Sequence, residues 1–196
     1  DKRLTSTRRA ANRPVLAQNR DRGDYRFVNV NATHSNETAI ALNLTHQDPV
    51  LREVFQNKDF RIGLSHAVNR QEIIEIVFGG QGQPHQVAPI PGESFYNEQL
   101  ATQYTAFDVD LANEYLDRAG YGRNSDGLRV GPDGEPISFV IEVPDYDGNA
   151  IDIAQLLVGY WERVGINAAF NISSQSLFFE RKGSNAHDVT LVRTPG

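Results

Sequence analysis

Hydrophobic residues along the chain change their spacing several times, and each change marks the border of an expected element. Alternation of apolar and polar residues predicts strands, whereas apolar residues three and four apart predict helices. The expected strands are at 25–30, 38–45, 137–143, 166–172 and 188–192. The expected helices are at 14–17, from Pro49 onward, at 60–78 with a break at Asn69, and at 109–119, 149–164 and 175–182.

Residues that favour helix ends stand at several of these borders. Asp48, Asn69 and Asp108 each precede a helical pattern. A side-chain oxygen at such a position accepts a hydrogen bond from a free backbone N–H of the first turn. Asn69 and Glu72 have capping-box spacing, so we expect Glu72 to reach back to the start of its helix. Gly120 is expected in the left-handed conformation that ends the helix opened by Asp108.

The order of the elements predicts an α/β fold. The last third alternates strand, helix, strand, helix and strand, which is typical of a mostly parallel sheet covered by helices. Residues 123–135 contain two Asp-Gly turn signals and are expected to form a hairpin-like segment. Residues 79–96 are rich in glycine and proline, and a loop of this length in a compact domain usually has a function.

Composition narrows the class of protein. Hydrophobic residues make up 39% of the 196 residues and charged residues 22%, as in ordinary globular proteins. No stretch approaches the roughly 18 apolar residues of a membrane helix. The absence of cysteine removes disulfides, thiolate metal sites and cysteine nucleophiles. Because the chain starts at Asp1 and contains no methionine, we expect a processed product or an excised fragment.

The first 26 residues form a basic arm. They carry eight lysines and arginines against three aspartates, whereas the whole chain has a net charge of -6. A basic arm is compatible with nucleic-acid binding, but its only aromatic residue is Tyr25, so it offers no platform for stacked bases. We therefore expect no nucleic-acid partner and interpret the arm as an edge segment of a neighbouring domain.

The sequence offers no motif for metal or nucleophilic chemistry. No pair of the five histidines has metal-ligand spacing, so no metal and no cofactor are expected. Ser65 and His66 are adjacent on one helix and point about 100° apart, which excludes a nucleophile–base pair. Asp145 and Asp147 lie in an expected turn, where we interpret them as solvated turn residues and not as an acid–base pair. We therefore expect a protein that is not an enzyme.

Several segments occur in an order that resembles one protein family. They are Leu42–Thr45, Phe55–Ile74, Gly79–Gly80, Pro89–Tyr96, Asp108–Tyr121, Trp161–Ile166 and His187–Asp188. Together they resemble domain III of the family 5 extracellular solute-binding proteins of ABC importers, which include oligopeptide, dipeptide and nickel receptors. The resemblance covers roughly residues 25–196, and it depends on the order and spacing of the segments more than on any single motif.

The resemblance implies an architecture and a place of action. Residues 25–196 would form lobe III of a periplasmic-binding-protein type II fold, and residues 1–24 would belong to or pack on lobe I. Such receptors close on a ligand between lobes I and III by a hinge and deliver it to ABC permease subunits. The expected location is the periplasm or the outer side of the membrane, with a lipoprotein anchor as one form of the full-length protein. The family chain continues past Val192 through a tryptophan and an acidic residue, so this chain alone is expected to bind ligand weakly.

Four residues are the predicted ligand contacts. Phe95 and Tyr96 lie in the loop at 79–96 and could face the cleft. The alternative interpretation, which we favour slightly, is that both rings anchor this loop to its own domain. Arg193 and Thr194 follow the last strand, and open α/β sheets bind ligands at the carboxyl ends of their strands. The family's default ligand is an oligopeptide, and an oligosaccharide is the runner-up.

Two alternatives come from other functional classes. One is a sensor or docking module that uses the same lobe without import. The other is a hydrolase that assembles an active site from separated carboxylates, with Glu142, Asp145 and Asp147 as the best candidates.

Overall fold

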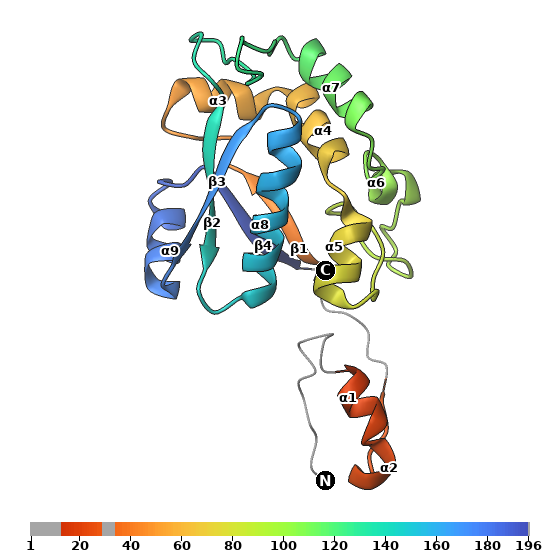
Figure 1. The fold of residues 1–196 in the computed structure, drawn as a ribbon. Helices are drawn as coiled ribbons and strands as arrows, with labels where there is room; N and C mark the ends of the chain where they lie inside the picture. The colour runs from red at the N-terminus through yellow and green to blue at the C-terminus, as the bar shows by residue number, and fades with distance from the viewer. Residues whose placement is uncertain (1–12, 29–33, 196) are drawn as a thin grey trace.

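The computed structural model describes residues 13–28 and 34–195, in which four strands form one open sheet (Figure 1). The strands are β1 (His34–Leu42), β2 (Ser138–Pro144), β3 (Asn167–Ser173) and β4 (Val189–Pro195). Their order across the sheet is β1-β4-β2-β3. Strands β2, β3 and β4 are parallel, whereas β1 pairs with β4 in the antiparallel direction. The predicted α/β fold with a mostly parallel sheet is confirmed.

Helices fill the intervals between the strands. They are α1 (Arg13–Gln18), α2 (Arg20–Gly23), α3 (Pro49–Gln56), α4 (Lys58–Ala67), α5 (Arg70–Phe78), α6 (Glu98–Thr102), α7 (Val109–Arg118), α8 (Gly148–Arg163) and α9 (Gln175–Gly183). Every predicted helix is present, and α2 and α6 were not predicted. None of the helices within the described part of the chain has the length and apolarity needed to cross a bilayer.

The predicted helix caps are confirmed. The side chain of Asp48 accepts from the N–H of Val50 at 2.8 Å, and Asp108 accepts from the N–H of Leu111 at 2.9 Å. Asn69 likewise accepts from the N–H of Glu72 at 3.1 Å and separates α4 from α5. Gly120 has a φ of 93°, as expected for the residue that ends α7.

The capping box at Asn69 is incomplete. The Glu72 carboxylate accepts from the side-chain amide of Asn69 at 3.2 Å and from the Tyr160 hydroxyl at 2.9 Å. It therefore joins α5 to α8 instead of returning to the backbone N–H of Asn69. Desolvation, followed by the neighbouring Glu72 carboxylate, raises the pKa of the Tyr160 hydroxyl, which keeps that group as a donor.

The predicted strand at 25–30 is wrong over 25–28, which have no regular structure, and its last two residues lie outside the described residues. The Tyr25 hydroxyl donates to the carbonyl of Leu16 in α1, and the Tyr25 and Phe27 rings meet edge to face with centroids 6.1 Å apart. The alternation of apolar and polar residues at 25–28 therefore reflects local packing against α1 and not a strand. A strand also needs a neighbouring strand to complete its hydrogen-bond ladder, and the sheet order contains none for this segment.

Two loop predictions are confirmed. The described structure contains no helix or strand at 79–97, which matches the expected glycine- and proline-rich loop. The hairpin-like segment at 123–135 is present as two isolated antiparallel bridges, Arg123 with Arg129 and Val130 with Pro136.

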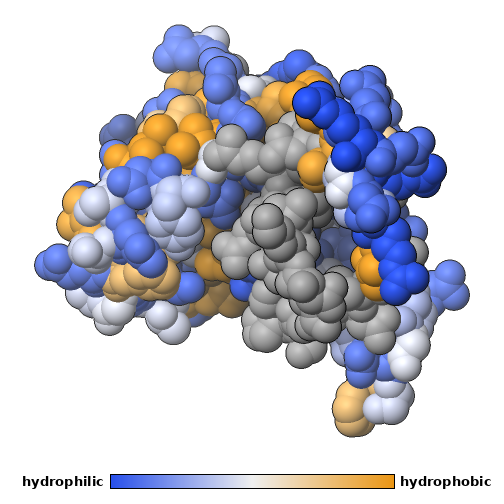
Figure 2. All heavy atoms as spheres, turned by 90° about the horizontal axis from the view of Figure 1, so that it is seen from below, coloured by the Kyte–Doolittle hydropathy of each residue, from blue (hydrophilic) through white to orange (hydrophobic). Residues whose placement is uncertain are grey.

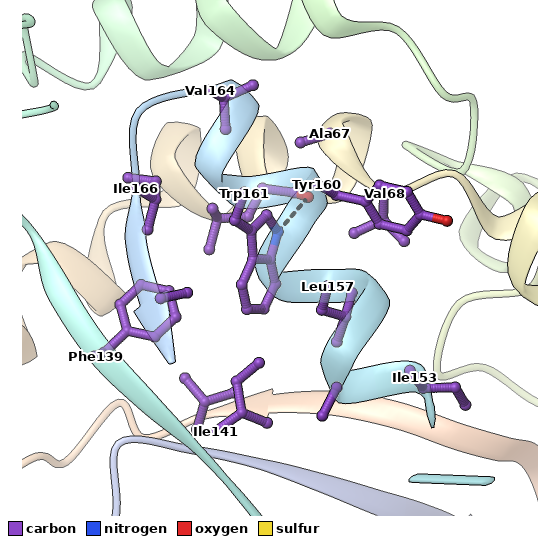
Figure 3. Packing of buried hydrophobic residues seen from close by; sticks show 14 of the residues in the cluster. Ala67, Val68, Phe139, Ile141, Ile153, Leu157, Tyr160, Trp161, Val164 and Ile166 are labelled. Atoms are coloured by element: carbon purple, nitrogen blue, oxygen red, sulfur yellow. Dashed lines mark hydrogen bonds between the residues drawn. The ribbon is translucent and has the colours of Figure 1, made fainter. Parts of the chain in front are cut away.

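The hydrophobic core centres on Trp161 in α8 (Figure 3). Its indole ring meets the Phe139 ring of β2 at 5.5 Å between centroids, and its N–H donates to the carbonyl of Leu64 in α4 at 3.2 Å. Leu157 and Ile141 complete the contact between α8 and the sheet and are fully buried. The core thus joins the sheet, α8 and the helical layer of α4.

Helices α8 and α9 cover opposite faces of the sheet. Along β2, side chains alternate between the two faces. Phe139 contacts Trp161 of α8, whereas Glu142 pairs with Arg181 of α9. The face toward α9 therefore carries a buried carboxylate, whereas the face toward α8 is apolar.

Candidate functional site: a hollow at the carboxyl end of β2

An open hollow of about 390 Å³ lies where β2 ends, beside residues 191–193 in the middle of β4, between the start of α8 and the side of α9. In Figure 1, β2 ends and α8 begins at the lower end of the sheet. Figure 2 shows the molecule from that end, where hydrophobic residues form separate groups among hydrophilic ones. The lining residues are Pro144, Tyr146, Asp147, Gly148, Asn149, Phe178, Phe179, Lys182, Leu191, Val192 and Arg193.

The turn after β2 forms one wall of the hollow. Pro144 ends the strand, and Asp147 caps α8 by accepting from the N–H of Ala150 at 3.1 Å. Tyr146 stands in the same turn with more than half of its surface exposed. Because α8 is 16 residues long, its amino end places a partial positive charge beside the hollow.

Helix α9 forms the opposite wall. Phe178 is buried, whereas Phe179 is 51% exposed, and the two rings meet edge to face with centroids 5.5 Å apart. Lys182 follows one turn later and adds an ammonium group to the lining. Ser174 caps the helix by accepting from the N–H of Leu177 at 3.4 Å, which sets where this wall begins.

The lining carries two cationic side chains, Lys182 and Arg193, and one carboxylate, Asp147. Arg193 pairs with Glu37 of β1 at 2.8 Å, and both side chains are largely exposed. Within residues 13–28 and 34–195, Lys182 has no ion-pair partner. The lining thus combines a lysine, an arginine and a helix amino end with the rings of Tyr146 and Phe179. Such a lining suits a ligand with an anionic or polar group and apolar surface.

The four predicted contact residues lie in different places. Arg193 lines the hollow. Thr194 follows it outside the lining, and its hydroxyl is 2.7 Å from that of Ser35 and accepts from the N–H of Asn36 at 3.2 Å. Thr194 therefore links the strands at the point where both leave the sheet.

Phe95 and Tyr96 do not line the hollow. Phe95 is 83% exposed, and the backbone N–H of Tyr96 donates to the carbonyl of Glu93 at 3.1 Å in a turn. Their role as ligand contacts stays a prediction that depends on what faces this loop.

Sequence reasoning missed the larger part of the lining, including Tyr146, Asn149, Phe179 and Lys182. A usable signal was present. The rule that ligands bind at the carboxyl ends of parallel strands pointed to Arg193, although Arg193 and Thr194 lie within β4 and do not follow it as expected. The same rule applied to β2 indicates 145–149. No comparable signal marks the α9 residues, because their approach to β4 depends on tertiary packing.

The three carboxylates considered for hydrolysis do not converge. Glu142 is buried and paired with Arg181, Asp147 caps α8, and Asp145 is exposed in the turn. Throughout the described residues, no group of three or more histidine or acidic side chains is placed to hold a metal ion.

Comparison with known proteins identifies the family. The family described as bacterial extracellular solute-binding proteins, family 5 Middle, matches residues 5–195. The chain belongs to this family. The resemblance inferred from the order of the sequence segments is thereby confirmed.

The curated relatives are named for the peptides they bind. Di/tripeptide-binding protein 1 of Pseudomonas aeruginosa is 27% identical over 157 residues, which is 80% of this chain and 26% of that protein. Oligopeptide-binding protein AppA of Bacillus subtilis is 25% identical over 130 residues, or 66% of this chain and 24% of the relative. This chain of family 5 thus spans about a quarter of the length of the relatives that it matches.

Solved structures share the fold. An oligopeptide-binding protein OppA superimposes with a TM-score of 0.86 and 32% identity, covering 95% of this family 5 chain and 29% of that one. The periplasmic binding protein MelB of Agrobacterium fabrum, solved with stachyose, superimposes with a TM-score of 0.68 and 20% identity. The match covers 80% of this chain and 25% of the MelB chain. The observed sheet therefore belongs to a periplasmic-binding-protein architecture.

Proposed function

We propose that the chain is the ligand-capture lobe, lobe III, of an ABC importer's receptor that acts outside the cytoplasmic membrane. In this proposal residues 25–196 form the lobe, and residues 1–24 belong to or pack on lobe I. The lobe captures an oligopeptide and catalyses no reaction, and the closed, loaded receptor docks on permease subunits in the membrane. The peptide-binding names of the relatives support this choice of ligand class.

The observation that carries the proposal is the position and chemistry of the hollow. It lies at the carboxyl end of β2 and beside the middle of β4, and open α/β sheets hold ligands at the carboxyl ends of their parallel strands. Its cationic groups would face a carboxylate or carbonyl groups of a peptide, and its aromatic rings would face side chains. An open hollow on one lobe suits a ligand that a second lobe covers from the opposite side.

The ends of β1 and β4 support closure by a hinge. His34 is in register with Pro195, so the chain enters and leaves the sheet at the same place. The register is irregular between His34 and Ala39, and irregular pairing of this kind bends a strand. Two adjacent strands that leave the sheet side by side would form a hinge about which a second lobe could rotate relative to this one. A ligand bound between the two lobes would stabilise the closed state.

A sugar ligand is the second candidate. Tyr146 and Phe179 present exposed rings at the hollow, and carbohydrate rings stack on such surfaces. A sensor or docking module remains the alternative from another class, and it would show neither ligand nor permease contact.

Native mass spectrometry of the gently purified full-length protein tests the proposal. A cluster of peptide masses is expected on the wild-type protein. The Lys182→Ala/Phe179→Ala variant is expected to lose these masses. Leu177→Ala, which changes an exposed residue of the same helix outside the lining, is expected to keep them. A ladder with hexose spacing would replace the peptide by an oligosaccharide, and an empty protein would favour the docking module.

A further inference from the structure

Strand β2 carries an acidic residue where a central strand is normally apolar. Glu142 lies in the middle of Ser138–Pro144, and β2 has a neighbour on each side in the sheet. Only 6% of its side chain is exposed. Because burying a carboxylate costs free energy unless the charge is paired, a residue of this kind in a central strand requires an explanation.

Both carboxylate oxygens of Glu142 have a specific partner. Oε1 accepts from the Arg181 guanidinium of α9 in an ion pair. Oε2 accepts from the side-chain amide of Asn171 at 3.0 Å, and Asn171 is the register partner of Glu142 on β3. The amide fixes the carboxylate on the sheet, so its other oxygen presents a fixed acceptor to α9.

Helix α9 has few other attachments along its length. Phe178 is its only buried residue, whereas Leu177 and Phe179 are largely exposed. Among the described ion pairs, Arg181–Glu142 is the one that joins α9 to the sheet. If Phe178 were the only anchor, α9 could rotate about the contact that this ring makes. The ion pair of Arg181, three residues later on the same side of the helix, removes that freedom.

The same helix supplies a wall of the hollow. Phe178, Phe179 and Lys182 line it, and Arg181 is adjacent to Lys182. On the sheet, Pro144 and Glu142 are two residues apart on β2 and therefore share a face. Pro144 reaches the lining, and Glu142 lies one step further from it along the strand.

We infer that Glu142 is a positioning residue for the ligand site: through Arg181 it holds α9 in the rotation that places Phe179 and Lys182 at the hollow. This inference rests on the proposed function of the hollow as the ligand site. Glu142 contributes no contact to the ligand itself, because its two oxygens are occupied and it is absent from the lining. The buried charge is thus explained by the fixed geometry that it gives to α9.

Hydrogen exchange and peptide binding by four single variants of the full-length protein, and by the double variant Glu142→Gln/Arg181→Met, test the inference. Glu142→Gln and Arg181→Met each remove the ion pair, whereas Arg181→Lys keeps a cation opposite Glu142. Glu180→Gln is the matched control, since Glu180 is an exposed acid of the same helix and makes no described side-chain contact. The binding probes are trialanine and tetra-alanine, measured by calorimetry.

Glu142→Gln and Arg181→Met are expected to speed amide exchange in 175–183 while 138–144 and 148–163 stay as protected as in the wild type. Their affinity for the probes is expected to fall on the order of tenfold, the size of effect that outer supporting residues have at other binding sites. Arg181→Lys is expected to keep most of the affinity. The double variant is expected to lose no more than either single one, because the two groups act as a pair.

The two readouts separate the inference from the proposed function. Unchanged exchange in 175–183, or equal effects of Glu180→Gln and Glu142→Gln, would overturn the positioning role. A wild-type protein that binds neither probe would contradict the peptide proposal, while the exchange data would still decide whether Glu142 holds α9.

Discussion

Asp188 accepts a hydrogen bond from the backbone N–H of Val140 at 2.8 Å through Oδ2, while its Oδ1 lies 2.9 Å from His46 Nε2. Asp188 immediately precedes β4. Strands β2 and β4 are paired in register only at Ile141 with Val189 and Glu142 with Thr190, and the side chain of Asp188 adds a further hydrogen bond to this short ladder. A side chain here replaces a missing backbone acceptor. This explains in physical terms why an aspartate stands directly before the strand.

Asp188→Ala is expected to lower the free energy of unfolding by about 2–3 kcal/mol, since it leaves the N–H of Val140 without an acceptor in a half-buried place. Urea unfolding followed by Trp161 fluorescence measures this change. Asp126→Ala, in an exposed turn, is the control and is expected to stay within about 0.5 kcal/mol of the wild type. Equal losses in the two variants would show that the hydrogen bond to Val140 contributes nothing.

Two helical glycines are expected to respond to alanine in opposite directions. A Cβ at Gly63 of α4 would stand 2.7 Å from Leu116 Cγ and 3.0 Å from the Ala112 carbonyl of α7, so Gly63→Ala forces the helices apart. We expect a loss of about 1–3 kcal/mol from this overpacking. A Cβ at Gly159 of α8 meets nothing within 4 Å, so Gly159→Ala should gain about 0.5–1 kcal/mol from helix propensity. Thermal unfolding of both variants measures the contrast, and a gain in Gly63→Ala would contradict it.

Arg129 is expected to be among the most sensitive polar positions. Its side chain is 1% exposed and donates to the carbonyl of Val164 at 2.8 Å, to Asp117 Oδ1 at 2.7 Å and to Asn113 Oδ1 at 2.8 Å. Arg129→Met leaves the buried carbonyl of Val164 without this donor and should cost about 1–3 kcal/mol, measured by urea unfolding. Asp117 is 66% exposed, so Asp117→Asn should cost less than about 1 kcal/mol. Comparable losses in Arg129→Met and Asp117→Asn would mean that the ion pair, and not the buried hydrogen bonding of Arg129, makes the larger contribution to the free energy of unfolding.

Stability is expected to fall as the pH drops below the ordinary histidine range. Desolvation by burial lowers the pKa of His187 from 6.5. The backbone of Arg181 and the charge of Asp188 oppose this effect, whereas the charges of Lys182 and His46 add to it. The folded state then binds the proton less readily than the unfolded state. The contribution of His187 is therefore fully present above pH 6.5 and is lost as the pH falls from there toward the lowered pKa. Urea unfolding between pH 5 and 8 measures the slope, which should be shallower in His187→Gln than in the wild type.

Local signals were sufficient for most of the elements. Asp48, Asn69 and Asp108 marked helix starts correctly because a capping side chain and the backbone it binds are only a few residues apart. The strand predicted at 25–30 is wrong over 25–28 because alternation says nothing about whether a neighbouring strand exists. The Asp-Gly turns and the loop at 79–96 were recognised from residues whose backbone preferences are intrinsic.

The sequence by itself determined the α/β class, the helix borders and the family, since periodicity, caps and the order of motifs are all properties of local segments. Only the tertiary structure decided the strand order β1-β4-β2-β3, the antiparallel direction of β1, and the meeting of Glu142 with Arg181. It also brought 144–149 and α9 to one hollow and left Phe95 and Tyr96 outside it. The physical reason is that hydrogen bonds between strands and contacts between distant side chains depend on which segments become neighbours, and the same local pattern is compatible with many such arrangements.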